Sequence, residues 1–204
     1  PESDVVFASK AFPCTAVYRV LAEEGLGCDV ASAGELALAL RGGFSADRVH
    51  LHGNAKTAAE LSYAVDAGIG HVIADNLRDL ELLETIVQPG ARQSVLLRIA
   101  PGVSGETHPS ISTGGPNTKF GFSLADAPAA IERAQASERI VLEGLHFHVG
   151  SQLMETDVFA GALEAIAPLG DFPTVNLGGG LGVAYLADDD PPSIEDYVAA
   201  KVDA

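Results

Sequence analysis

Short apolar segments with strand character alternate along the chain with segments of helical period. The helical segments carry start and stop signals: Ser32 is a candidate N-cap with Glu35 three residues later, and Gly42 and Gly43 follow that helix. The predicted strands are 5–8, 28–31, 49–52, 71–74, 94–99, 140–149 and 174–177. The predicted helices are 13–24, 32–41, 58–67, 77–86, 124–137, 158–167 and one opening at 191–193, with a long polar loop at 100–122.

Strands that alternate with helices of this length favour an α/β fold with parallel pairing through right-handed crossovers. An open doubly wound sheet would normally show glycines after its first strand, but residues 9–13 contain none. The spacing of the units fits a (β/α)8 TIM barrel, which takes about 250 residues when complete. We therefore expect residues 1–204 to form one partial barrel domain whose last strand is absent from this chain.

Charge excludes two classes of partner. Lys and Arg number 12 against 28 Asp and Glu, a net charge of −16, which argues against binding to nucleic acid or to an anionic membrane surface. No apolar run approaches the ~20 residues of a membrane span, and the start does not resemble a signal peptide. Cys14 and Cys28 are interpreted as free thiols. These features predict a cytoplasmic protein.

Polar residues follow the predicted strands, where parallel barrels place their reactive groups. They are Lys10, Asp29, Asn54, Asp75, Arg98, His148 and the glycine run 178–180. A lysine at a strand end can form an imine with an aldehyde, although a lysine there can also simply extend into solvent.

Two histidines share one face of a predicted strand. His146 and His148 alternate with the apolar residues Leu145, Phe147 and Val149. They could bind a metal together with other strand-end groups such as Asp29 and Asp75, or His148 could stack on a planar ligand. Two ordinary core histidines are the third possibility.

The glycine run predicts an anion site. Gly178, Gly179 and Gly180 follow the seventh predicted strand, and TIM barrels commonly bind phosphate after strands seven and eight. Ser151, after Gly150, offers a second N–H and a hydroxyl to the same anion. Because the spacing is not G-x-G-x-x-G, a dinucleotide site is disfavoured.

A lysine for an imine, an imidazole for a ring face and a phosphate cradle together describe a site for pyridoxal 5′-phosphate (PLP). The chain also resembles the barrel domain of the alanine-racemase-fold PLP-dependent decarboxylases over nearly its whole length. The segments that carry the resemblance are Ser9–Ala11, Asp29–Glu35, Gly53–Lys56, His146–Gln152 and Leu177–Gly182.

The long loop is similar to the diaminopimelate decarboxylase branch of that family rather than to the ornithine or arginine decarboxylases, through His108–Gly114 and Lys119–Gly121. The resemblance implies decarboxylation of meso-2,6-diaminopimelate to L-lysine and CO2. The alternatives are another basic amino acid as substrate, a metal-dependent barrel hydrolase using His146 and His148, and a non-catalytic relative, which the retained Lys10 and glycines disfavour.

The resemblance also implies individual roles. Lys10 would hold PLP as an imine and return a proton after CO2 leaves, and His148 would stack on the pyridine ring. The phosphate would be bound by Ser151 and Gly178, Gly179 and Gly180, with Gly180 the best match, while Asp29, Glu35 and Arg98 would line the pocket. Lys119 would lie near the interface of a homodimer whose active site is built between two chains.

The sequence departs from the family pattern at its end. The Glu-Pro-Gly-Arg motif of the eighth strand and the C-terminal β-domain do not occur in these residues. We therefore expect that residues 1–204 alone do not decarboxylate.

Overall fold

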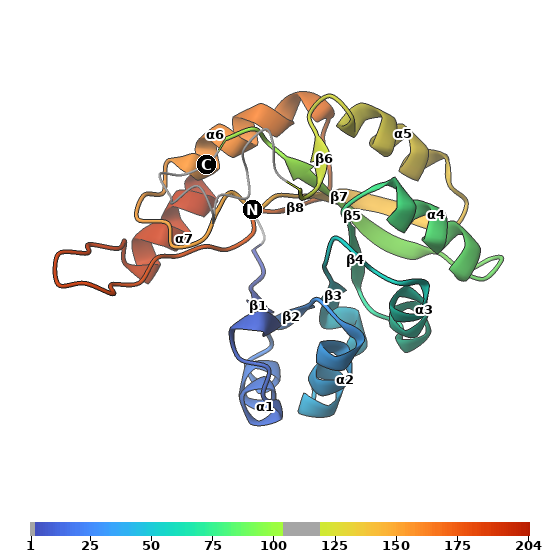
Figure 1. The fold of residues 1–204 in the computed structure, drawn as a ribbon, viewed down its shortest axis with the longest axis horizontal. Coiled ribbons are helices and arrows are strands. Elements are labelled where there is room, and N and C mark those ends of the chain that lie inside the picture. Colours follow the sequence, from blue (N-terminus) through green and yellow to red (C-terminus); the bar gives the residue numbers. More distant parts are fainter. Residues whose placement is uncertain (1–2, 104–118) are drawn as a thin grey trace. The chain divides into compact units, whose positions relative to one another are not determined.

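The computed structural model describes residues 3–103 and 119–204, in which strands and helices alternate along the chain (Figure 1). The helices are α1 (Thr15–Glu23), α2 (Ala33–Gly42), α3 (Ala58–Ala67), α4 (Leu77–Ile86), α5 (Ala127–Ala136), α6 (Val158–Ile166) and α7 (Ile194–Asp203), with 3₁₀ turns η1 (Ser9–Ala11), η2 (Ala46–Arg48) and η3 (Ala167–Leu169). The strands are β1 (Val6–Ala8), β2 (Gly27–Val30), β3 (Val49–Leu51), β4 (His71–Ala74), β5 (Gln93–Ala100), β6 (Phe122–Ser123), β7 (Ile140–His146) and β8 (Thr174–Asn176). None of the helices in these ranges is long and apolar enough to cross a bilayer.

The chain forms two compact units. The N-terminal unit contains Glu2–Leu96 and Glu132–Glu143, and the C-terminal unit contains Leu97–Ile131 and Gly144–Ala204. The boundaries pass through β5, α5 and β7, so each of these elements contributes to both units.

Parallel strands β1 to β4 pair in chain order in the N-terminal unit. Their register aligns Ala8 with Asp29, Asp29 with His50, and His50 with His71. Residues directly paired across parallel strands project to the same face of the sheet. One face therefore carries an aligned row of polar side chains from β2 to β4.

The helices of the N-terminal unit begin and end on local signals. Ser32 accepts a hydrogen bond from the Glu35 backbone N–H at 3.2 Å, and the C-cap of α2 is Gly43, whose φ of 109° suits glycine. Thr57 and Glu60 form a reciprocal capping box at the start of α3. These caps fix where each crossover leaves and rejoins the sheet.

The apolar faces of the helices cover the strands. The fully buried residues come from both helices and strands, and burying each large side chain contributes about 1.5–3 kcal/mol relative to leaving it exposed. In the N-terminal unit they include Tyr18, Leu36, Leu51, Leu61, Ile73, Leu80 and Leu83.

The C-terminal unit contains two parallel strand pairs. Strand β6 pairs with β5, and β8 pairs with β7 in a register that places Gly144 beside Thr174. A Cβ at Gly144 would lie 1.8 Å from the Thr174 carbonyl oxygen, so only glycine fits where these strands approach.

Most predicted elements are confirmed, including helices 58–67 and 77–86 and strand 71–74 at their expected bounds. Several other bounds differ by one or two residues, and three differences matter more. Strand β7 ends at His146 rather than Val149, α5 begins at Ala127 rather than Leu124, and β6 lies partly inside the predicted loop. The first error arises because the apolar alternation continues past His146 although the backbone leaves the sheet there.

Candidate functional site

Lys10 lies in the 3₁₀ turn η1, directly after β1, and its side chain is exposed. The preceding residue anchors the turn: Ser9 is buried, its hydroxyl accepts a hydrogen bond from the Tyr18 hydroxyl at 2.7 Å, and its carbonyl accepts from the Phe12 N–H at 3.1 Å. Tyr18 is itself fully buried. The core therefore holds the turn while the lysine amine remains accessible, as a group that reacts with an aldehyde requires.

Asp29 lies one strand away from that turn, between two imidazoles. Its Oδ1 is 3.3 Å from His50 Nδ1 and 3.1 Å from His52 Nε2. Burial by itself would raise the pKa of Asp29, but the adjacent imidazoles of His52 and His50 outweigh it and hold that pKa well below its usual range. Asp29 is therefore an ionised carboxylate at neutral pH.

The row continues across the sheet to β7. The rings of His50 and His71 meet edge to face with centroids 4.8 Å apart, and His71 Nε2 lies 2.7 Å from Glu143 Oε2. Ser94 donates to the other Glu143 oxygen at 2.5 Å. Burial raises the pKa of Glu143, but the hydrogen bonds from Ser94 and His71 lower it overall. We call Asp29, His50, His71 and Glu143 the polar row.

Sequence reasoning identified Asp29 but missed the histidines beside it. A signal was present, because Ala8, Asp29, His50 and His71 each lie 21 residues after the one before. When successive strand–helix units have the same length, residues at that spacing in the sequence lie on the same face of the sheet. The 21-residue spacing alone could therefore have predicted the row.

A buried ion pair joins the loop after β3 to the first turn of α4. Lys56 Nζ lies 2.7 Å from Asp79 Oδ2, both side chains are 2% exposed, and the ammonium also donates to the Gly53 carbonyl at 2.6 Å. The same Asp79 oxygen accepts from the backbone N–H of Asp75 at 2.9 Å. The pair thus holds the backbone of Asp75, a strand-end residue that the sequence singled out, and of Gly53, which directly precedes Asn54.

Glu35 contributes its carboxylate to the start of α2. Its Oε2 accepts a hydrogen bond from the Ala31 N–H at 2.6 Å, while its own N–H donates to Ser32. The predicted role of Glu35 in lining a cofactor pocket remains a prediction.

The glycine run forms a tight turn after β8. Gly178 and Gly180 have φ of 65° and 121°, and a Cβ on them would lie 2.5 Å from the Phe147 carbonyl oxygen and 2.4 Å from that of Gly150. A Cβ on Gly179 would meet nothing within 4 Å, so the turn is open at its middle residue. The Gly180 N–H makes no hydrogen bond within the described part of the chain. We call these three residues the glycine turn.

His148 and Ser151 lie beside the glycine turn. The Gly179 N–H donates to His148 Nδ1 across 3.4 Å, and Ser151 is exposed directly after Gly150. His148 is half-buried, whereas His146 is only 3% exposed. The imidazole available to a ligand is therefore that of His148.

Arg98 lies on β5, half-buried, with its guanidinium carbon 4.5 Å from the centre of the Phe120 ring. Lys119 Nζ lies 5.1 Å from the centre of the same ring. The loop motif His108–Gly114 lies outside the described residues.

The predicted site residues thus fall into two groups. Lys10, Asp29 and Glu35 belong to the N-terminal unit, whereas Arg98, His148, Ser151 and the glycine turn belong to the C-terminal unit. The alternative function, a metal-dependent hydrolase, would need a set of metal ligands. The described residues contain no group of three or more His, Cys, Asp or Glu placed to hold a metal ion.

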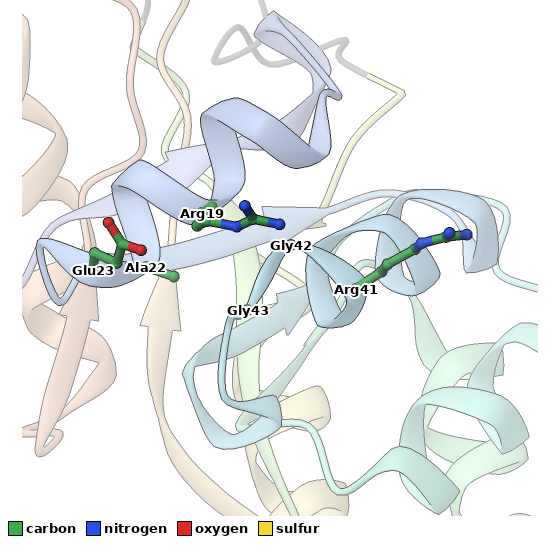
Figure 2. Close-up of a pocket in the computed structure, with 6 residues that line it drawn as sticks. All are labelled: Arg19, Ala22, Glu23, Arg41, Gly42 and Gly43. Atoms are coloured by element: carbon green, nitrogen blue, oxygen red, sulfur yellow. The ribbon is translucent and has the colours of Figure 1, made fainter.

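Two surface pockets are lined by other residues. One, of about 360 Å³, is lined by the ends of α1 and α2, where Arg19 and Arg41 extend from neighbouring helices (Figure 2). The other, of about 350 Å³, is mostly apolar and includes Leu145, Leu163 and Val175. None of the predicted site residues lines either pocket.

Comparison with known proteins links these features to one family. The model of the pyridoxal-dependent decarboxylase pyridoxal-binding domain matches residues 1–204. Diaminopimelate decarboxylase of Mycobacterium tuberculosis (strain H37Rv) is 43% identical over 97% of this chain and 48% of its own length. The Bacillus subtilis (strain 168) enzyme of that name is 41% identical over 100% of this chain and 49% of its own.

Solved structures agree with the sequence comparison. Helicobacter pylori diaminopimelate decarboxylase, complexed with L-lysine, is 28% identical with a TM-score of 0.92, covering 99% of this chain and 54% of that one. A lysine/ornithine decarboxylase from Vibrio vulnificus, complexed with putrescine, is 26% identical with a TM-score of 0.79 over 98% of this chain and 52% of that one.

The predicted fold class, a PLP-binding TIM-barrel fold with parallel strands, is confirmed by these similarities. The chain spans about half the length of the curated relatives that it matches. The resemblance inferred from the sequence motifs is confirmed as well, since the family model covers every residue. The chain therefore belongs to the pyridoxal-binding domain family of the pyridoxal-dependent decarboxylases, whose cofactor is PLP.

Proposed function

We propose that the protein containing this chain decarboxylates meso-2,6-diaminopimelate to L-lysine and CO2. The observation that carries the proposal is the glycine turn: an open middle residue, a Gly180 N–H that makes no hydrogen bond in the described chain, and His148 beside it. The names of the relatives support the choice of substrate.

The residues present fit PLP. Backbone N–H groups without Cβ atoms suit a phosphate, and an accessible lysine amine suits an aldehyde. Lys10 would hold the cofactor covalently, Ser151 and the glycine turn would bind its phosphate, and His148 would cover one face of its ring. Asp29, Glu35 and Arg98 would complete the pocket. When bound, the pyridine ring supplies the electron sink that decarboxylation requires.

The chain's own groups would do the remaining work. Lys10, on an anchored turn, would deliver its proton from a fixed position to the carbon that loses CO2. Asp29 is ionised on the neighbouring strand and would offer a fixed negative charge to a cationic nitrogen at the Lys10 position. His52 and His50 would keep that carboxylate in place.

Replacing Lys10 tests the covalent role. In the full-length protein, Lys10→Ala is expected to abolish the borohydride-fixed PLP adduct and lower the rate of lysine formation by several orders of magnitude. Lys56→Arg is a matched control, since it keeps a buried cation in the same unit. A PLP adduct fixed on another lysine in Lys10→Ala would contradict the assignment.

Replacing the histidines tests the ring contact. His148→Ala is expected to raise the dissociation constant of PLP more than His146→Ala does, because only His148 is partly accessible. Equal or reversed effects, measured by absorbance titration, would show that the wrong imidazole has been chosen.

A comparison of amino acids as substrates tests the substrate assignment. Diaminopimelate, lysine, ornithine and arginine are to be compared as substrates at equal concentration. The likeness to a lysine/ornithine decarboxylase complexed with putrescine makes another basic amino acid the second candidate. A higher kcat/KM for ornithine or lysine than for diaminopimelate would favour it.

We also propose a cytoplasmic homodimer whose active sites lie near the subunit interface, with Lys119 on that side. The resemblance to the family supports this proposal. Light scattering of the full-length protein is expected to give the mass of a dimer, and Lys119→Glu is expected to shift it towards monomer. A wild-type monomer that is fully active would overturn the proposal.

A further inference from the structure

Lys201 lies on α7, and its ammonium contacts the glycine turn. Its Nζ donates to the Gly178 carbonyl oxygen at 2.6 Å. The same atom lies 4.6 Å from the centre of the Phe159 ring and 4.5 Å from that of Tyr197, and these two rings meet edge to face. A half-buried cation between two aromatic faces with a carbonyl acceptor has a defined position.

The hydrogen bond fixes one peptide group. In a trans peptide the carbonyl and the N–H that follows it point in opposite directions. With the Gly178 oxygen held by Lys201, the Gly179 N–H must point away from α7. On that side it meets His148 Nδ1, at 3.4 Å. One peptide unit therefore connects the ammonium of Lys201 to the imidazole of His148.

This connection determines the protonation of the imidazole. A nitrogen that accepts a hydrogen bond carries no proton, so a neutral His148 must carry its proton on Nε2. The positive charge on Lys201 draws electrons from the Gly178 carbonyl, which makes the Gly179 N–H a stronger donor to Nδ1.

We propose that Lys201 is a positioning residue, which orients the Gly178–Gly179 peptide and through it holds His148 as its Nε2–H tautomer. The part of this proposal that concerns cofactor affinity rests on the proposed function, whereas the part that concerns His148 does not.

Lys201 could instead serve only to pack α7 against α6, and its removal would then change stability alone. The two roles differ at His148, because loss of packing does not select between the ring nitrogens. Burial lowers the pKa of Lys201 to about 8, so its charge can also be removed without mutation. Tyr197, the titratable residue of the same helix whose ring contacts the Lys201 ammonium, does not interfere, since burial raises its pKa to about 12.

The experiment uses the cofactor-free full-length protein, with nitrogen NMR of the His148 ring and the Gly179 amide. Wild type is expected to show Nδ1 unprotonated, and Lys201→Met is expected to show a mixture of the two tautomers. Lys201→Arg should restore the wild-type pattern, and Val202→Ala, at an exposed position of α7, should leave it unchanged. In wild type, the Gly179 amide signal should shift with a midpoint near pH 8.

PLP affinity is measured separately on the same proteins. Lys201→Met is expected to weaken PLP binding about tenfold, the size of one lost charged hydrogen bond, and Lys201→Arg less. An unchanged His148 tautomer in folded Lys201→Met, together with no amide shift near pH 8 in wild type, would overturn the proposal. Failure of wild type to bind PLP would overturn the proposed function but not the tautomer result.

Discussion

In the N-terminal unit, charged side chains hold one another in place, whereas in the C-terminal unit peptide groups form the main polar surface. The polar row and the Lys56–Asp79 pair are contacts between side chains from different strands and loops. In the glycine turn, in contrast, a Cβ on Gly178 or Gly180 would collide with backbone, and Gly180 has an N–H that makes no hydrogen bond within the described residues. The first arrangement can tune charge, and the second can approach an anion closely.

This difference implies that substitutions destabilise the two units in different ways. A charge lost from the N-terminal unit leaves a buried partner without its counterion, whereas an added atom in the C-terminal unit displaces backbone. Measurements of the stability of single-residue variants test this contrast.

Lys56→Met breaks the most buried ion pair of the N-terminal unit. Asp79 would remain buried without its counterion, so the free energy of unfolding is expected to fall by about 3–5 kcal/mol. Denaturant titration of the full-length protein measures this. Arg133→Met is the matched control, since the Arg133–Glu84 pair is 50% and 25% exposed and should lower the free energy of unfolding far less. Equal losses for the two variants would contradict the assigned difference.

Gly180→Ala adds one methyl group to the glycine turn. Its Cβ would lie 2.4 Å from the Gly150 carbonyl oxygen at a φ of 121°, so a loss of about 2–3 kcal/mol is expected, together with weaker binding of inorganic phosphate. Gly179→Ala, which meets nothing within 4 Å, should cost about 1 kcal/mol or less. If Gly179→Ala proved the more damaging, the geometry assigned to the turn would be wrong.

Acid is expected to weaken the polar row. Because the pKa of Asp29 is lower in the folded protein than in the unfolded chain, the unfolded chain binds more protons at low pH. The stabilisation by Asp29 is therefore present above pH ~4 and is lost as the pH falls further. Wild type should lose about 1 kcal/mol more than Asp29→Asn between pH 5 and 3, as measured by thermal unfolding. Parallel pH profiles for the two proteins would show that Asp29 is not held ionised.

Local signals predicted most of the fold. Ser32, Thr57 and the glycines at helix ends mark boundaries through contacts within a few residues, and such contacts are visible in sequence. The glycine turn was predicted for the same reason. Strand β6 was missed because two residues that pair only through β5 leave no periodic pattern.

The unpredicted parts of the candidate site depend on partners far apart in the chain. Lys56 meets Asp79, His71 meets Glu143, and Lys201 meets Gly178. No local pattern connects such residues, because each contact exists only after strands and helices have packed. In the sequence, Lys201 has only the features of an ordinary cation in the last turn of a helix. The structure shows its contact with the glycine turn.

The polar row also has a consequence for the order of folding. Strands β1 to β4 pair with neighbours close in sequence, so their contacts can form soon after those residues leave the ribosome. Glu143 lies 72 residues after His71 and reaches the row much later. During synthesis, His71 therefore faces a sheet that is already paired while its carboxylate partner is still missing. The N-terminal unit, including the contact between His71 and Glu143, can therefore be completed only after β7 has been synthesised.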